Sequence, residues 1–310
     1  MEQWIAFYRT NGIATALNII LEEDMKSKAP KIQNEAARER FRSAAGRLWP
    51  NADSLWVGGY VEYEWQHGRH IFESANLVRT GCNVLEFGCN VGATSVVLAA
   101  MGANVTAIDV NPDYVEIARL NSECYGLESR IRFVHVADTT HLPFDGEQFD
   151  LVTCNSVLEY VPHAALRSVQ REIDRVLKPG GTIAVLGTSS RMWPREVHSG
   201  RWLVNYLPRR IDAMFGSDIQ RGVFPWHLRY GFGGHYQDSG LEDDGASYLE
   251  ARKKIGSGSL KSTLMKTAVH LLSPLGISVG LLTPNISLLL CKDKRVRAGD
   301  SEEPNLNSRL

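Results

Sequence analysis

Between Asn83 and Ser190 the chain alternates short apolar runs with longer amphipathic patterns, and this alternation restricts its fold more than any other feature. Apolar runs separated by helical segments are typical of βαβ units, in which right-handed crossovers join parallel strands. The five runs that we interpret as strands read NVLEF, NVTAID, IRFVHVAD, FDLVTCNSV and TIAVLGTS. They predict an α/β fold with a doubly wound, Rossmann-like and mostly parallel sheet.

The flanking sequence predicts additions to this core. Apolar residues at helical spacing indicate helices over 1–24, 31–47, 59–78 and 258–272. The segments GISVGLL and ISLLLCKD predict two closing strands joined by a tight turn, which brings the expected sheet to seven strands. Residues 191–250, rich in Trp, Tyr, His, Arg and Gly, are expected to form an insertion after the fifth strand rather than sheet.

We therefore divide the chain into five parts. They are an N-terminal helical cap (1–80), the core (81–190), an insertion or lid (191–257), a C-terminal helix with closing strands (258–293) and a disordered tail (294–310).

Composition narrows the class of protein. Lys and Arg number 34 against 35 Asp and Glu, so net charge gives no attraction to nucleic acid. The five cysteines lack CxxC or Cys/His spacing, which argues against disulfides and a zinc site. The longest apolar stretch, 268–291, is broken by Pro274, Gly276, Gly280 and Pro284. We expect a cytoplasmic protein with no signal peptide, metal, nucleic-acid partner or stable membrane insertion, and we leave its oligomeric state open.

The loop after the first predicted strand, Glu86-Phe87-Gly88-Cys89-Asn90-Val91-Gly92, is the expected ligand site. In doubly wound sheets, ligands bind at the carboxyl ends of the strands. Glycines allow the backbone to approach a ligand closely, and Asn90 is the type of residue that best tolerates a left-handed conformation. We interpret Cys89 as a small loop residue and not as a nucleophile.

Three acids distinguish this loop from a dinucleotide site. Asp109 ends the second strand, where a carboxylate can accept both ribose hydroxyls. Asp138 ends the third strand, where a carboxylate can accept from an adenine amino group. Glu86 precedes the glycines and suits a positively charged ligand better than a pyrophosphate. The alternatives are that Asp109 caps the following helix and that Asp138 is a turn residue.

The segments VLEFGCNVG, VTAIDVNP, ADTTHLPFDGEQFDLVTCNSVLEYV and LKPGGTIAV together resemble the successive motifs of class I S-adenosylmethionine-dependent methyltransferases. The subgroup resembled is that of ubiquinone, menaquinone, sugar and natural-product methylation, and the match covers about 82–188. The resemblance implies S-adenosylmethionine as cofactor. It implies that Glu86, Gly88 and Gly92 hold its methionine part, that Asp109 takes the ribose, and that Asp138 and Thr139 meet the adenine edge. It also implies that Asn155 and Ser156 close the site under the sulfonium. The further predicted cofactor residues are Cys89, Asn90, Val110 and Tyr60.

The acceptor is expected to be a small molecule. The fourth strand ends Asn155-Ser156-Val157-Leu158 and lacks the Asn/Asp-Pro-Pro-Tyr/Phe sequence associated with methylation of nucleobase or glutamine nitrogen. We favour an oxygen of a sugar, a phenol or quinone precursor, or a carboxylate, and N- or C-methylation is the alternative. The predicted acceptor-binding residues are Tyr160, Trp193, Arg201, Trp202 and Tyr206. A lid with its own small core would use several of the same aromatic side chains.

His198 is the preferred general base, because imidazole titrates near neutral pH and the residue follows the fifth strand. His163 is the second candidate, and a surface or structural histidine is the alternative for both. Tyr60, Tyr63 and His67 share one helix face, and a helix here often covers the methionine end in the resembled group. A Rossmann oxidoreductase and a non-catalytic cofactor-binding subunit remain as competing functions.

Overall fold

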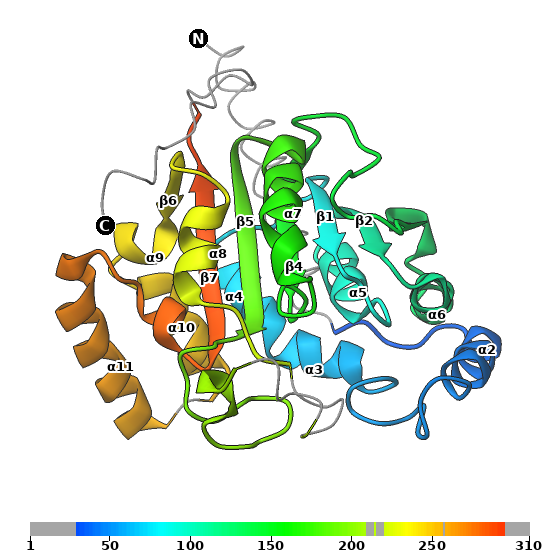
Figure 1. The fold of residues 1–310 in the computed structure, drawn as a ribbon. Coiled ribbons are helices and arrows are strands. Elements are labelled where there is room, and N and C mark those ends of the chain that lie inside the picture. Colours follow the sequence, from blue (N-terminus) through cyan, green and yellow to red (C-terminus); the bar gives the residue numbers. More distant parts are fainter. Residues whose placement is uncertain (1–28, 209–213, 215–219, 257, 295–310) are drawn as a thin grey trace, which may run out of the picture.

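The computed structural model describes residues 29–208, 214, 220–256 and 258–294, and within them it contains one seven-stranded sheet (Figure 1). The strand order is β3-β2-β1-β4-β5-β7-β6, in which β7 runs antiparallel to both of its neighbours and the first five strands are parallel. This confirms the predicted fold class. The strands are β1 (Asn83–Phe87), β2 (Asn104–Asp109), β3 (Ile131–His135), β4 (Phe149–Asn155), β5 (Leu177–Ser189), β6 (Tyr236–Asp238) and β7 (Asn285–Lys292).

Helices cover both faces of the sheet and create two apolar cores (Figure 1). On one face, side chains such as Phe41, Phe72 and Val97 pack against β1, β2 and β4. On the other face, Leu166, Val169 and Ile173 of one amphipathic helix pack against the opposite sides of the same strands. The first group of helices is α2 (Glu35–Ala45), α3 (Tyr60–Gln66), α4 (Gly68–Ser74), α5 (Ala93–Ala100) and α6 (Pro112–Cys124). The second is α7 (His163–Val176) and α8 (Pro225–Gly231).

Two glycines of the predicted ligand loop are required by the backbone. Gly88 has φ of +78°, and a Cβ there would overlap the Val157 side chain. Gly92 has φ of +75° and begins α5, and a Cβ there would lie 2.9 Å from the Ala118 Cβ. Asn90 has φ of +48°, which confirms its left-handed conformation. The loop can therefore bring its backbone close to a ligand at the end of β1.

The predicted helix over 59–78 is wrong as a single element. It is divided into α3 and α4 at His67, whose backbone (φ −123°, ψ −67°) is not helical. The carboxylate of Glu64 occupies the space that a side chain on Gly68 would need. The break thus accommodates a buried acid behind the ligand loop.

The C-terminal prediction is also wrong in part. The segment GISVGLL does not form a strand, because Val279–Leu282 is a 3-10 helix, η5, in which Gly280 lies against the backbone of Ser287. The missing strand is β6, which comes from the predicted insertion and pairs with β7 through Tyr236 and Lys292. Its three residues carry little strand signal, so pairing with β7 decides their conformation.

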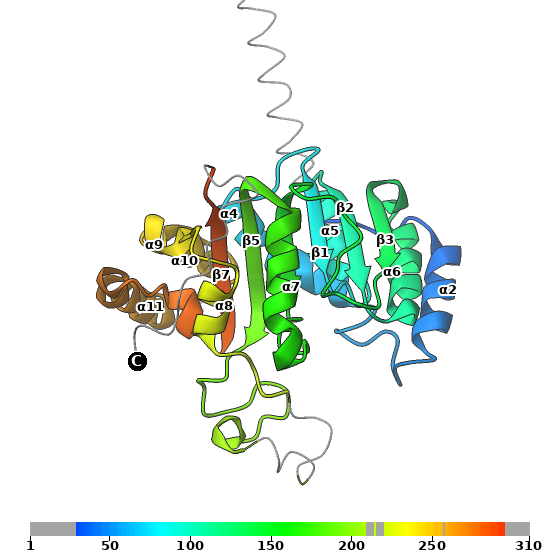
Figure 2. The same ribbon diagram turned by 45° about the horizontal axis from the view of Figure 1, so that its top comes forward.

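The second half of the predicted insertion is regular structure. It contains α8, β6, α9 (Ser239–Glu242) and α10 (Ala246–Lys254), and α10 packs against α4. The described residues that follow β5, 190–208, extend away from the sheet at the edge where the parallel strands end (Figure 2). The remaining elements are α11 (Ser259–Leu272) and the 3-10 helices η1 (Glu128–Arg130), η2 (Val204–Tyr206) and η4 (Ser273–Leu275).

Two predictions fall on other parts of the chain. The helix expected over 1–24 and the tail beyond Lys294 lie outside the described residues. Within the described ranges, no helix has the length and apolarity that a membrane span needs.

Candidate active site

A cavity of about 730 Å³ opens at the carboxyl ends of β1, β2 and β4. This volume lies within the usual range for small-molecule sites, about 300–1,000 Å³. Of the predicted cofactor residues, all but Gly92 line it. These lining residues are Tyr60, Glu86, Gly88, Cys89, Asn90, Asp109, Val110, Asp138, Thr139, Asn155 and Ser156.

The carboxylate of Asp109 is held in place by the loop backbone. Its Oδ2 accepts a hydrogen bond from the Asn90 amide (3.0 Å) and its Oδ1 from the Asn111 amide (2.9 Å). The N-cap of α6 is Asn111, whose side chain accepts from the Asp113 amide. The alternative in which Asp109 is the helix cap is therefore wrong. The fixed carboxylate faces the cavity, where it can accept from a ligand.

Asp138 is an exposed turn residue that also lines the cavity. Its Oδ1 accepts from the amide (2.9 Å) and the hydroxyl (2.6 Å) of Thr140. These hydrogen bonds, with a smaller contribution from His141, lower the pKa of Asp138. The turn interpretation is correct, and it leaves an ionised carboxylate at the cavity edge.

Glu86 is fully buried behind the ligand loop. Its carboxyl accepts from the hydroxyls of Ser95 and Thr94. Burial, and then the charge of Glu64, raise the pKa of Glu86 to about 8. Burial makes ionisation of this carboxyl unfavourable. A positively charged ligand beside it would therefore stabilise the ionised form strongly.

Glu64, on α3, is a site residue that the sequence reasoning missed. It is 5% exposed, and the side chains of Asn155 and Tyr60, two cavity residues, donate to its carboxyl. Burial raises its pKa to about 7. The sequence did contain a signal for this position. Glu64 lies four residues after Tyr60, and residues four apart lie on the same helix face, so a helix that turns Tyr60 toward the cavity also turns Glu64 toward it. An acid in an amphipathic helix is ordinarily solvated, so that signal was easily overlooked.

Aromatic rings line the mouth of the cavity near α3. Trp56, which we did not predict, lies 5.7 Å from Tyr60 and 5.0 Å from Tyr63, measured between ring centroids. Tyr63 stacks on His67 at 4.2 Å. The expected shared face of Tyr60, Tyr63 and His67 is present, although only Tyr60 and Trp56 line the cavity.

The segment after β4, which includes Tyr160, also lines the cavity. The ring of His198 lies edge-on to Tyr160, 5.6 Å away. His198 Nδ1 is 3.1 Å from the Glu196 carboxylate, and its Nε2 is 3.9 Å from Glu159. Burial raises the pKa of Glu159, and its Oε2 has no hydrogen-bond partner among the described residues. The structure thus places His198 between two acids, directly behind a cavity residue.

The other predicted catalytic and acceptor residues lie elsewhere. The ring centroids of His163 and His227 lie 5.4 Å apart, and His163 lines a separate pocket of about 20 Å³. Trp193 Nε1 donates to the Leu282 carbonyl (2.7 Å), and the Tyr206 hydroxyl donates to the Met192 carbonyl (2.6 Å). Neither these two nor Trp202 or Arg201 lines the large cavity. Their hydrogen bonds are those of a lid with internal structure, and acceptor binding by them stays a prediction.

Cysteine and metal chemistry are not indicated by the described residues. No group of three His, Cys, Asp or Glu among them could hold a metal ion. Burial, together with Glu86 and Asp109, raises the pKa of the Cys89 thiol well above its usual value. Cys89 therefore lines the cavity as a neutral thiol, in agreement with its interpretation as a loop residue.

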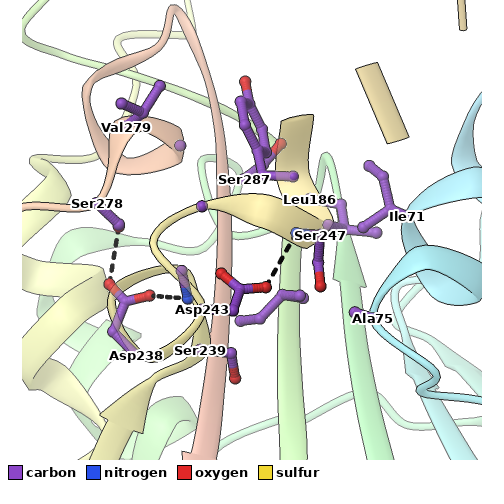
Figure 3. A pocket seen from close by; sticks show the side chains of 15 residues that line it. Ile71, Ala75, Leu186, Asp238, Ser239, Asp243, Ser247, Ser278, Val279 and Ser287 are labelled. Carbon is purple, nitrogen blue, oxygen red and sulfur yellow. Dashed lines mark hydrogen bonds between the residues drawn. The ribbon is translucent and has the colours of Figure 1, made fainter. Parts of the chain in front are cut away.

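A second cavity of about 40 Å³ shares none of these lining residues (Figure 3). It lies between α4, β5, β7 and the α9–α10 region. Asp238 accepts from the Ser278 hydroxyl (2.8 Å) and the Gly240 amide (3.0 Å), as Figure 3 shows. Asp243 Oδ1 and the Tyr248 hydroxyl are buried there with no partner among the described residues. The space suits a water molecule, so this cavity is a structural feature of the sheet edge.

Comparison with known proteins supports the same interpretation. The family model for a methyltransferase domain matches residues 85–185. The ubiquinone biosynthesis O-methyltransferase of Erwinia tasmaniensis is 33% identical over 198 residues, which span 61% of this chain and 74% of that enzyme. The enzyme of the same name from Xanthomonas oryzae is 35% identical over 143 residues, 44% of this chain and 57% of that one.

A solved methyltransferase from Methanosarcina mazei is also similar, with 27% identity and a TM-score of 0.36 over 38% of this chain and 57% of that one. The sequence relationships, the strand order and the acids around the cavity show that the chain belongs to the class I S-adenosylmethionine-dependent methyltransferases. Its methyl donor is S-adenosylmethionine, and the oxidoreductase alternative is wrong. The chain spans little more than half the length of several of the curated relatives it matches.

Proposed function

We propose that this protein transfers the methyl group of S-adenosylmethionine to a hydroxyl oxygen of a small phenolic acceptor. The observation that carries the proposal is the large cavity, which is lined both by acids that suit a cationic donor and by Tyr160, whose ring lies 5.6 Å from that of His198. The curated relatives named for ubiquinone biosynthesis and O-methylation support an aromatic hydroxyl as the first acceptor to test.

The acids and the ligand loop fit the donor. The buried carboxyls of Glu86 and Glu64 suit its positive charges, and the backbone of Gly88 allows close approach. We assign the ribose hydroxyls to Asp109, with Val110 beside it, and the adenine edge to Asp138 and Thr139. Cys89, Asn90 and Gly92 shape the loop, and we assign Asn155 and Ser156 to the sulfonium end of the donor. When bound, S-adenosylmethionine supplies an activated methyl group with a neutral thioether as leaving group.

The protein then has to align the acceptor, exclude water and remove one proton. We assign proton removal to His198, because Glu196 lies at its Nδ1 and can fix the orientation of the ring. Tyr160 separates His198 from the cavity in this conformation, so we further propose that acceptor binding moves Tyr160 aside. The segment between β5 and α8 serves as the acceptor-side lid.

The test is an acceptor screen with mass detection of one added methyl group. The panel contains catechols and other phenols with and without prenyl chains, sugars and carboxylic acids, and Asp109→Ala provides the control with impaired donor binding. We expect methylation of a phenolic hydroxyl that depends on the donor. Methylation of a carbon or nitrogen would contradict the proposal and favour C- or N-methylation. Donor binding without turnover on any acceptor class would also contradict it and favour a non-catalytic cofactor-binding subunit.

A further inference from the structure

We propose that Glu64 is a second acid of the donor site, a positioning residue that holds Tyr60 and Asn155 and couples donor binding to proton release. The proposal rests on binding of S-adenosylmethionine in the large cavity and is independent of the acceptor. Glu64 does not line the cavity itself, so it acts through the two side chains that donate to it and through its charge.

The geometry around Glu64 is built for a carboxyl. Its side chain enters the space left by Gly68, where a Cβ would overlap Oε2. The break between α3 and α4 at His67 creates that space. Asn155 Nδ2 donates to Thr94 Oγ1 (3.1 Å), and Thr94 interacts with Glu86 and lowers its pKa. Polar side chains that line the cavity, Asn155 and Thr94, therefore lie between Glu64 and Glu86.

The electrostatic surroundings contain an excess of acids. Glu64 faces Tyr60 and Tyr63 from α3 and Glu86 from β1, and Glu86 also faces Asp109 of β2. Burial has the strongest influence on both carboxyls, neutral hydrogen-bond donors oppose it, and acidic neighbours add to it at Glu86. A ligand with an ammonium and a sulfonium supplies positive charge to a region whose own groups resist ionisation.

The consequence is a dependence of donor affinity on pH. Without ligand, the pKa values of about 7 for Glu64 and about 8 for Glu86 leave both carboxyls largely protonated below neutral pH. A cationic ligand favours their ionised forms, so binding lowers both pKa values and releases protons. The α-ammonium of the donor titrates near pH 8 as well, so the consequence appears as a difference: the affinity of the wild type, relative to a variant without the Glu64 charge, rises as pH increases through this range.

The experiment is calorimetric titration of the full chain with S-adenosylmethionine, without acceptor, from about pH 6 to about pH 9 in buffers of different ionisation heat. Glu64→Gln keeps the shape of the side chain and removes its charge. We expect its affinity to be about tenfold below wild type near pH 8.5 and to approach wild type near pH 6, with fewer protons released. Glu62→Gln is the matched control, since Glu62 lies exposed on the same helix and accepts only from Gln66 in the described structure (3.0 Å).

A second variant keeps the proposal testable if Glu64→Gln fails to fold. Tyr60→Phe removes the hydroxyl that stabilises the ionised Glu64 and should move the midpoint of the affinity profile to higher pH. A Glu64→Gln profile that matches wild type, or that is weaker by one constant factor at every pH, would overturn the inference. Failure of the acceptor screen would leave this result unaffected, because no acceptor is present.

Discussion

Replacing Gly88 by alanine should destabilise the protein through two separable effects. The residue has φ of +78°, a conformation that costs an L-residue about 1–2 kcal/mol. In addition, the new Cβ would overlap the Val157 side chain, and overpacking of this kind costs about 1–3 kcal/mol. We expect the free energy of unfolding to fall by about 2–5 kcal/mol in total.

The chain offers a control with the same backbone conformation. Gly81 also has φ of +78°, but no atom lies within 4 Å of the position a Cβ would take. Gly81→Ala should therefore show only the conformational cost. The difference between the two variants measures the overlap with Val157, and adding Val157→Ala to Gly88→Ala should remove most of that difference.

Equilibrium urea unfolding monitored by circular dichroism gives the two free energies, and calorimetry gives the affinity for S-adenosylmethionine. We expect Gly88→Ala to weaken donor binding as well, since Gly88 lines the cavity and Gly81 does not. If both alanine variants lose the same stability and Val157→Ala restores nothing, the close approach of the loop to Val157 has no energetic role.

The remaining predictions concern three other positions. Asp109→Ala should weaken donor binding by about 1.5–3 kcal/mol in calorimetry, because it removes a fixed, charged hydrogen-bond acceptor; unchanged affinity would remove Asp109 from the ribose site. His198→Ala should lower kcat while leaving donor affinity near wild type, and full turnover would refute its role as base. Ser278→Ala should lower the free energy of unfolding by about 1–3 kcal/mol, since Asp238 stays buried and loses a donor; urea titration tests this, and an unaltered midpoint would contradict it.

The donor end of the site was predictable because its signals are local in the sequence. Gly88 follows β1 directly, Asp109 is the last residue of β2 and Asp138 lies three residues after β3, and parallel strands bring their carboxyl ends to one edge. The position of a residue in its strand thus determined its place in the cavity. Asn90 could be assigned its conformation for the same reason, since the turn from strand to helix involves only neighbouring residues.

The errors arise where distant segments decide the structure. Tyr236–Asp238 is a strand only because β7 lies beside it, and no pattern in three residues records such a partner. Glu64 is buried because α3 packs against α4 and α5, and the sequence of α3 does not say which elements it will pack against. His198 was preferred to His163 as the base, and only the folded loops show that His198 lies beside a residue of the cavity, whereas His163 lines a separate pocket.

The position of β7 between β5 and β6 has a consequence for the order of folding. β7 is the last strand of the described chain, yet its hydrogen bonds join β6 to the rest of the sheet. During synthesis on the ribosome, β5 has an open edge and β6 has no strand to pair with until Asn285–Lys292 has emerged. An unpaired edge of this kind favours association between nascent chains. Assembly of the donor half of the sheet can therefore precede closure of the other half, and the interval between the two is when the growing chain is most exposed to aggregation.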